Sequence, residues 1–254
     1  MNGLVFRRIR GTHGRRKSAR ACVMLRRFLV LVGIALGSIP ALAAEVLLSP
    51  PGTDGWKPLE FPKIPKHTTY TVVRDGDTQA VKAVSDCAAS ALYLPVTDVD
   101  LARTPRLQWR WKVEQPLAVA DERVKKGDDF AARAYVMFRF DPDRASLWQR
   151  LQHAIGTRLY GQVIPGGAIN YVWSSREARG AKWDNPFAST AKMVSLGSGL
   201  LPQWTTEVVD VAEDYRDLFG HEPPPVLAVA LMTDTDNSCQ QAVAYYADFR
   251  FLSR

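Results

Sequence analysis

Two acidic sets are the residues in this sequence whose types and spacing come closest to a chemical site. Asp128 and Asp129 stand directly before one alternating apolar segment, and Asp234, Asp236 and Asn237 follow another. Oxygen side chains that recur in a loop suit a hard cation such as calcium, which takes about six to eight oxygen ligands. Asp234, Asp236 and Asn237 are therefore candidate calcium ligands. Because Asp and Asn in turns commonly bond their own backbone, turn formation is the alternative for these three residues.

Paired carboxyl groups could also catalyse glycoside hydrolysis if they faced one cleft at the right separation. Asp128 and Asp129, with one of the later aspartates, are candidates for that role. Other catalytic signatures are absent: the three histidines after residue 43 lack metal-binding spacing, and no serine stands in a nucleophile elbow. We therefore expect a binding protein rather than an enzyme. Arg133, on the polar face of the following strand, is expected to pair with Asp128 or Asp129.

Aromatic residues supply the remaining candidates for a ligand site. All seven tryptophans lie after residue 43, and an exposed aromatic ring offers a flat apolar surface that can stack on a sugar. Asn170, Tyr171 and Trp173 form the best such group, which joins Asp128, Asp129 and Arg133 in one candidate ligand-binding set. Ordinary packing is the alternative for Tyr171 and Trp173.

The elements that must position these residues are mostly strands. Alternating or continuous apolar segments predict about ten of them, at residues 69–74, 79–85, 88–94, 106–113, 131–140, 169–173, 192–196, 204–209, 226–232 and 243–251. Helical spacing predicts an inserted helix at 146–160 and a short helix at 211–219, which follows a capping-box pattern at Asp210 and precedes Gly220. The pattern favours a mainly β fold, an antiparallel two-sheet sandwich of jelly-roll type. An antiparallel barrel is the alternative.

The first 43 residues are expected to be a leader that contains a signal peptide. Arg26 and Arg27 precede an apolar run from Phe28 to Leu36, which is too short to span a bilayer, and small residues end at Ala43. Met24 would open a signal peptide of ordinary length, and the export route stays open. Residues 44–68 then form an extended Pro-rich segment, and residues 69–254 form a single domain.

Charge and cysteine content agree with export. Residues 1–43 carry nine basic and no acidic residues, which leaves 24 basic and 26 acidic residues in the rest of the chain. A nearly neutral domain gives no electrostatic footprint for nucleic acid. Cys87 and Cys239 are the two cysteines after the leader, and an even pair in an oxidising compartment favours a disulfide between them; two unpaired thiols are the alternative.

Four segments together resemble the bacterial domain of unknown function 3047 family. They are residues 107–113 (LQWRWKV), 127–133 (GDDFAAR), 170–173 (NYVW) and 230–237 (ALMTDTDN). The resemblance implies a secreted bacterial protein and no assigned activity. Cys239 departs from the small residue, such as Gly, that the family pattern implies.

These observations predict a periplasmic or secreted sandwich protein that binds a glycan or another envelope component, with calcium as the candidate cofactor. A carboxylate-dependent glycan-active enzyme and a structural envelope protein are the alternatives. No nucleic-acid partner is expected, and no membrane span is expected after the leader is removed.

Export is directly testable. When the protein is expressed with its native leader in a Gram-negative host, the periplasmic form should begin near Ala44, because signal peptidase cuts after small residues such as Ala43. Intact-mass measurement decides this, and uncut protein confined to the cytoplasm would contradict it.

Overall fold

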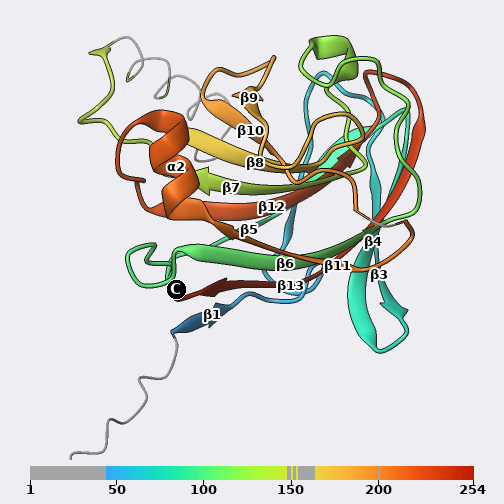
Figure 1. Ribbon diagram of the computed structural model, residues 1–254, viewed down its shortest axis with the longest axis horizontal. Helices are drawn as coiled ribbons and strands as arrows, with labels where there is room; N and C mark the ends of the chain where they lie inside the picture. Colours follow the sequence, from blue (N-terminus) through green and yellow to red (C-terminus); the bar gives the residue numbers. More distant parts are fainter. Residues whose placement is uncertain (1–43, 148–149, 151–152, 154–163, 200) are drawn as a thin grey trace, which may run out of the picture. The chain divides into compact units, whose positions relative to one another are not determined.

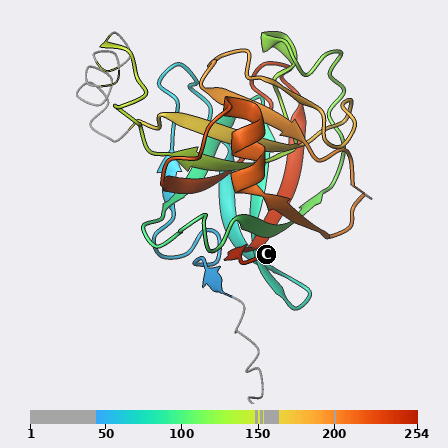
Figure 2. The ribbon, with the colours of Figure 1, turned by 60° about the vertical axis from the view of Figure 1, so that its left-hand side comes forward.

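The computed structural model describes residues 44–147, 150, 153, 164–199 and 201–254, which form two sheets of strands and one α-helix. The six-stranded sheet contains β1 (Glu45–Leu47), β3 (Thr69–Asp75), β4 (Thr78–Asp86), β6 (Arg106–Val113), β11 (Thr205–Asp210) and β13 (Gln241–Leu252). The seven-stranded sheet contains β2 (Lys57–Leu59), β5 (Ala89–Pro95), β7 (Ala132–Phe138), β8 (Gly167–Trp173), β9 (Lys182–Asp184), β10 (Ala191–Ser195) and β12 (Val226–Asp234). Figures 1 and 2 show the two sheets from two directions.

Strand order confirms the predicted sandwich. The six-stranded sheet runs β11-β6-β13-β4-β3, with β1 also on β13, and the seven-stranded sheet runs β2-β5-β12-β7-β8-β10-β9. From β4 to β7, and again from β10 to β13, the chain alternates between the sheets, as the connections of a jelly roll do. Each sheet keeps two edge strands, so the sheets do not close into a barrel. Among the pairs of described strands, β8 with β10 departs from antiparallel pairing and is parallel.

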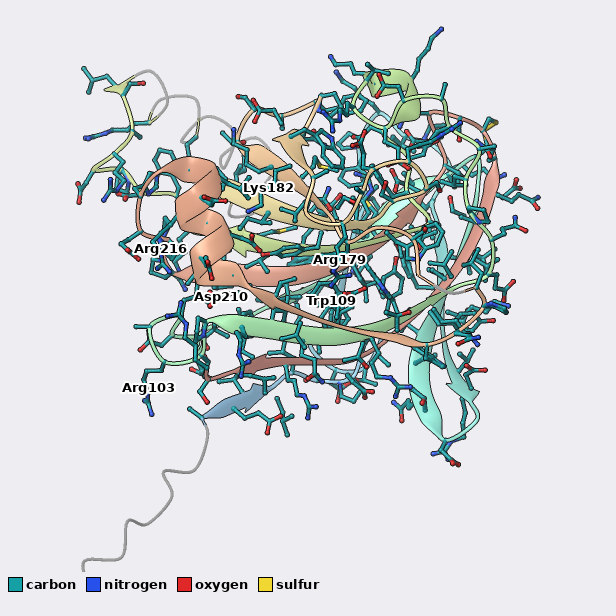
Figure 3. All side chains as sticks on the ribbon, in the orientation of Figure 1. Arg103, Trp109, Arg179, Lys182, Asp210 and Arg216 are labelled. Carbon is teal, nitrogen blue, oxygen red and sulfur yellow. A yellow bond between two sulfur atoms is a disulfide. The ribbon has the colours of Figure 1, made fainter. Side chains whose placement is uncertain are left out.

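The core between the sheets follows from the alternation in β6. Leu107, Trp109 and Trp111 are fully buried there, while the residues between them face outward. Trp109 meets Trp111 edge to face at 5.2 Å between ring centroids and lies 5.7 Å from the ring of Tyr171 on β8. Figure 3 shows Trp109 between the strands of the two sheets. Such rings bury large apolar areas and dominate core energetics.

The short helix α2 (Val211–Phe219) forms as predicted. The Asp210 side chain accepts a hydrogen bond from the Glu213 backbone N–H at 2.9 Å, and Gly220 ends the helix with a φ of +75°. Lys182 of β9 pairs with Asp214 and with Asp217 of α2. The inserted helix expected at 146–160 falls largely outside the described residues. None of the helices in the described part of the chain has the length and hydropathy needed to span a bilayer.

The Pro-rich segment is more regular than its composition indicates. Residues 44–68 include the short strands β1 and β2, which pair with β13 and β5 at the sheet edges. Their strand character depends on hydrogen bonds to distant strands, which a local sequence pattern does not encode.

The predicted disulfide between Cys87 and Cys239 is present. It joins the turn between β4 and β5 to the turn between β12 and β13, so it ties together two crossovers between the sheets that are distant in sequence. Both cysteines have a positive φ, of +53° and +54°, a region where glycine is the usual residue. That backbone conformation agrees with the small residue that the family pattern implies at position 239.

The disulfide should contribute strongly to stability. Its cysteines are 152 positions apart, and closing a loop of that length constrains the unfolded chain by about 4–5 kcal/mol in the loop-entropy account, an upper value. Urea unfolding of a Cys87→Ser/Cys239→Ser variant should therefore show a clearly lower free energy of unfolding. Equal stability of the variant and the parent would contradict this contribution.

Candidate functional site

The outward face of the seven-stranded sheet carries a row of side chains that crosses six of its strands. Backbone register places these residues side by side, and we call them the cross-sheet row: Tyr93, Ala230, Tyr135, Asn170, Met193 and Trp183. Their neighbours in each strand, such as Leu94, Val136 and Tyr171, point into the core instead. Tyr93, Tyr135 and Trp183 are partly exposed, whereas Ala230, Asn170 and Met193 are buried.

Asn170 is the polar residue of this row, and its hydrogen bonding is incomplete. It is only 1% exposed. Its Nδ2 donates to the sulfur of Met193 at 3.2 Å, but its Oδ1 has no partner. Trp183 Nε1 is likewise buried without a partner. A buried polar atom without a hydrogen bond costs about 1–3 kcal/mol, so two of them on one sheet face call for a group that would satisfy them.

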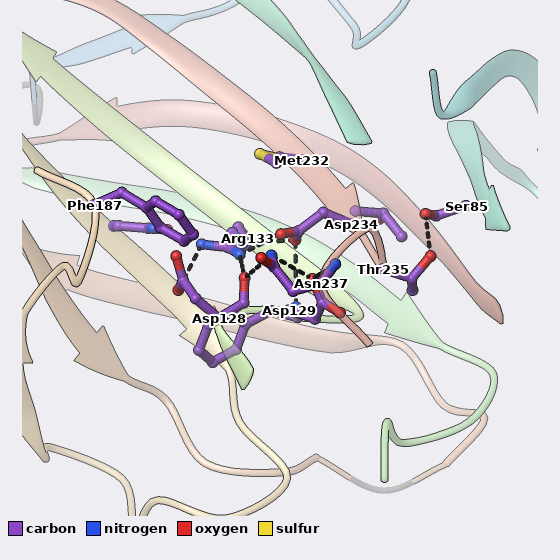
Figure 4. A network of polar contacts seen from close by, with 12 residues as sticks. Ser85, Asp128, Asp129, Arg133, Phe187, Met232, Asp234, Thr235 and Asn237 are labelled. Atoms are coloured by element: carbon purple, nitrogen blue, oxygen red, sulfur yellow. Dashed lines mark hydrogen bonds and ion pairs between the residues drawn. The ribbon is translucent and has the colours of Figure 1, made fainter. Parts of the chain in front are cut away.

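Arg133 lies one row away on the same face and is the centre of a buried charge cluster, shown in Figure 4. Its Nε donates to Asp234 Oδ1 at 2.7 Å, and its Nη2 also contacts the Asp234 carboxylate. Its Nη1 lies 3.3 Å from Asp128 Oδ1, and its guanidinium stands 4.5 Å from the ring centroid of Phe130. The predicted pairing with Asp128 is confirmed, and Asp234 rather than Asp129 is the second partner.

Asp129 stabilises the turn after β12 by accepting hydrogen bonds from it. Its Oδ1 accepts from the backbone N–H of Asn237 at 3.1 Å and from Asn237 Nδ2 at 3.0 Å, and its Oδ2 accepts from the Ser238 N–H at 2.6 Å. The sequence left turn formation open for Asp234, Asp236 and Asn237; Asn237 does lie in this turn, but its side chain bonds to the distant Asp129.

The metal prediction is altered by this geometry. Carboxylate oxygens of Asp129, Asp234 and Asp236 lie within 4.8 Å of one another, so Asp129 replaces Asn237 in the predicted set of ligands. Asn237 turns its amide nitrogen toward Asp129 and thus acts as a donor there, not as an oxygen ligand. Arg133 and the turn amides already occupy oxygens of Asp234 and Asp129. The trio could hold a cation only by sharing those oxygens.

Tyr171 and Trp173 are a correction to the predicted ligand set. Both belong to the core-facing half of β8 and are buried among the sandwich core residues. Their rings therefore do not form an exposed stacking surface, because alternation along the strand turns Asn170 outward and Tyr171 inward. The candidates Asp128, Arg133, Asn170 and Asp234 do gather on one face of the seven-stranded sheet.

Burial favours the protonated form of the carboxyl groups in and beside this cluster. Burial raises the pKa of Asp234 to about 8, against the opposing effect of Arg133, and burial also raises the pKa of Asp128 and of Asp236. Raised carboxyl pKa values occur in catalytic acids. Here, however, Asp128 and Asp234 are buried and both face one guanidinium, so neither is placed to reach a substrate. Arg133 and its two carboxyl partners instead link β7, the loop before β7 and the end of β12.

Sequence reasoning missed Tyr93, Tyr135 and Trp183 in the cross-sheet row, and Asn185, whose Nδ2 donates to Asp128 Oδ2 at 3.2 Å. The alternating apolar residues at 131–140 predict that Tyr135 lies on the outward face of β7. The order of strands in the sheet, which brings these side chains together, was not encoded in any local pattern.

Comparison of sequences assigns the family. The model of the family described as "Protein of unknown function (DUF3047)" matches residues 54–250, and the chain belongs to this family. No curated protein sequence matches the chain.

Several solved structures are distantly similar. One is a family 11 carbohydrate-binding module from Clostridium thermocellum in complex with a β-1,3-1,4-mixed-linked tetrasaccharide (TM-score 0.39, 9% identity, 84% of this chain and 97% of that chain). Another is the family GH12 endoglucanase 3 of Trichoderma harzianum (0.39, 10%, 84% and 98%). A third is the xyloglucanase domain of NopAA from Sinorhizobium fredii in complex with cellobiose (0.33, 9%, 85% and 100%). At this level of similarity no function or residue role is transferred.

Stability should fall as pH rises toward 8. Between the ordinary Asp value of 3.8 and about 8, the folded cluster binds protons that the unfolded chain has released, so protonation stabilises the fold at the acidic end. This contribution is lost as the pH passes the raised pKa. Chemical unfolding of the wild type at about pH 5 and about pH 8 should show a smaller free energy of unfolding at the higher pH.

An Asp128→Asn variant tests the origin of that trend. It removes one of the surplus carboxyl groups around Arg133, so its stability should change less with pH than that of the wild type. Asp54→Asn, at an exposed position, is the matched control and should keep the wild-type profile. A wild-type stability that is constant or increases over this range would show that the cluster retains no proton.

Proposed function

We propose that this protein is an exported glycan-binding module that holds its ligand on the outward face of the seven-stranded sheet. The observation that carries the proposal is the unpartnered Oδ1 of buried Asn170, in a row that also contains Tyr93, Tyr135 and Trp183. Because Asn170 is buried in the free protein, the side chains that cover it must shift before a sugar hydroxyl can donate to this amide oxygen. Aromatic side chains beside it supply apolar contact to sugar rings.

The spacing of the row suits an extended chain of sugars. Tyr93 and Tyr135 lie on strands separated only by β12, so their backbones are about 10 Å apart. Ala230 lies between them and adds no bulk above the sheet. Trp183 lies at the far edge, three strands from Tyr135. A ligand laid across the strands would meet the two tyrosines, Asn170 and Trp183 in that order.

The Arg133 cluster supports this face without contacting the ligand in our proposal. It fixes the loop that carries Asp128 and Phe130, and Phe130 lies 6.5 Å from the ring of Trp183. Asn185 joins the loop after β9 to Asp128. The cluster therefore sets the positions of the segments that border the cross-sheet row.

A periplasmic or secreted location is part of the proposal. The leader pattern in residues 1–43 supports it, and so does the disulfide, since disulfides persist in oxidising compartments. The envelope is where a polysaccharide ligand of such a protein would be found.

The test separates binding from folding. In an Asn170→Leu variant the unpartnered carbonyl is gone, so its free energy of unfolding should equal or exceed that of the wild type by up to about 1 kcal/mol. The same change removes the hydrogen bond to the ligand. Affinity electrophoresis with soluble β-glucan, xyloglucan and solubilised peptidoglycan should show retardation of the wild type by at least one of them, weakened about tenfold in the variant.

Tyr135→Ala should weaken retardation in the same way, because it removes a stacking surface. Tyr245→Ala is the matched control, since Tyr245 is a comparably exposed tyrosine of β13 in the other sheet, and it should leave retardation unchanged. Retardation that survives both the Asn170 and Tyr135 changes, or is absent with every polysaccharide, would contradict the proposal.

A further inference from the structure

A hollow lies at the edge of the sandwich, away from the cross-sheet row. It has a volume of about 510 Å³ and is bordered by β11 and by the loops that follow β8 and β10. That volume lies within the range of about 300–1,000 Å³ that is usual for small-ligand sites. The residues that matter to the argument are Trp173, Arg179, Gly199, Thr205 and Glu207.

Glu207 is a buried acid that faces inward. In β11 the residues Thr205, Glu207 and Val209 turn toward the other sheet, and Glu207 is 3% exposed. Arg179 Nη2 donates to its Oε2 at 2.6 Å, and Arg179 Nη1 donates to the carbonyl of Leu196 at 2.9 Å. Glu207 Oε1 has no hydrogen bond within the described part of the chain. The charge of Glu207 is therefore neutralised while one of its oxygens is free to accept.

Two further polar atoms meet at Gly199. A methyl group added at this glycine would stand 2.9 Å from Thr205 Oγ1 and 3.4 Å from Trp173 Nε1. Neither atom forms a hydrogen bond to another described residue, and Trp173 is 3% exposed. The ring of Trp173 packs in the core, and its Nε1 lies beside Gly199, which borders the hollow. Glycine at position 199 keeps the space in front of that N–H open.

We propose that this hollow binds a small neutral ligand with adjacent hydroxyl groups, of the size of one sugar ring or a cyclic polyol. A hydroxyl of the ligand donates to Glu207 Oε1, and its neighbour accepts from Trp173 Nε1 and pairs with Thr205 Oγ1. A neutral ligand is favoured because Arg179 already balances the charge of Glu207. This site is independent of the cross-sheet row and does not rest on the function proposed for it.

The indole N–H of Trp173 provides a direct readout. Nitrogen–proton correlation NMR of the full exported chain, titrated separately with methyl glucoside, methyl galactoside, N-acetylglucosamine and myo-inositol, should show saturable movement of one indole signal with at least one probe. Absence of that signal in Trp173→Phe assigns it. Glu207→Gln and Thr205→Val should each weaken the binding about tenfold, and Gly199→Ala should abolish it by filling the space.

Thr206→Val is the matched control, because Thr206 is the next residue of β11 and faces outward. It should leave the binding unchanged. A Trp173 signal that does not move with any of the four probes, or that moves equally in Gly199→Ala, would overturn the proposal. Because the probes and variants differ from those of the polysaccharide assay, failure of one proposal leaves the other standing.

Discussion

The burial of Arg133 is the constraint on which the arrangement around the outward sheet face depends. A guanidinium that is 2% exposed must be paired and hydrogen-bonded, since an unpaired buried charge is very costly. Asp234 at the end of β12 and Asp128 in the loop before β7 supply the partners. The attraction of both carboxyl groups to Arg133 holds the loop before β7 and the end of β12 beside β7. Asp129, the neighbour of Asp128, accepts a hydrogen bond from the turn that follows β12.

Because side chains alternate along a strand, the two faces of the seven-stranded sheet carry different kinds of residues. In β8, Tyr171 and Trp173 fill the core, and Asn170, which directly precedes Tyr171, faces outward with an unsatisfied oxygen. In β7, Ala134 and Val136 are core residues, and Arg133 and Tyr135 face outward. The main hydrophobic core thus lies on one face, and the other face carries the Arg133 cluster, two smaller buried clusters and the cross-sheet row. A buried unsatisfied amide in such a position is a cost to the free protein that binding would recover.

The sequence predicted most strands, α2 and the disulfide, because alternation, capping and cysteine count are local or compositional signals. It also named Asp128, Arg133 and Asn170 as ligand-binding candidates, and Asp234 as a candidate calcium ligand. It assigned Tyr171 and Trp173 to the wrong role, because a short apolar run leaves the direction of each side chain open until the neighbouring strands are known. Tyr93 and Trp183 could not be joined to Asn170 by sequence, since only the strand order β5-β12-β7-β8-β10-β9 makes them neighbours. The second partner of Arg133 could not be predicted either, because Asp234 is 101 positions away in the sequence.

The most direct measurement of the central claim is a crystal structure of the protein with an oligosaccharide derived from the polysaccharide that retards it. Our account predicts a sugar hydroxyl within hydrogen-bond distance of Asn170 Oδ1, with sugar rings over Tyr93 or Tyr135 and the Arg133 cluster unchanged. An oligosaccharide bound away from this face, with Asn170 Oδ1 still unpartnered, would contradict it.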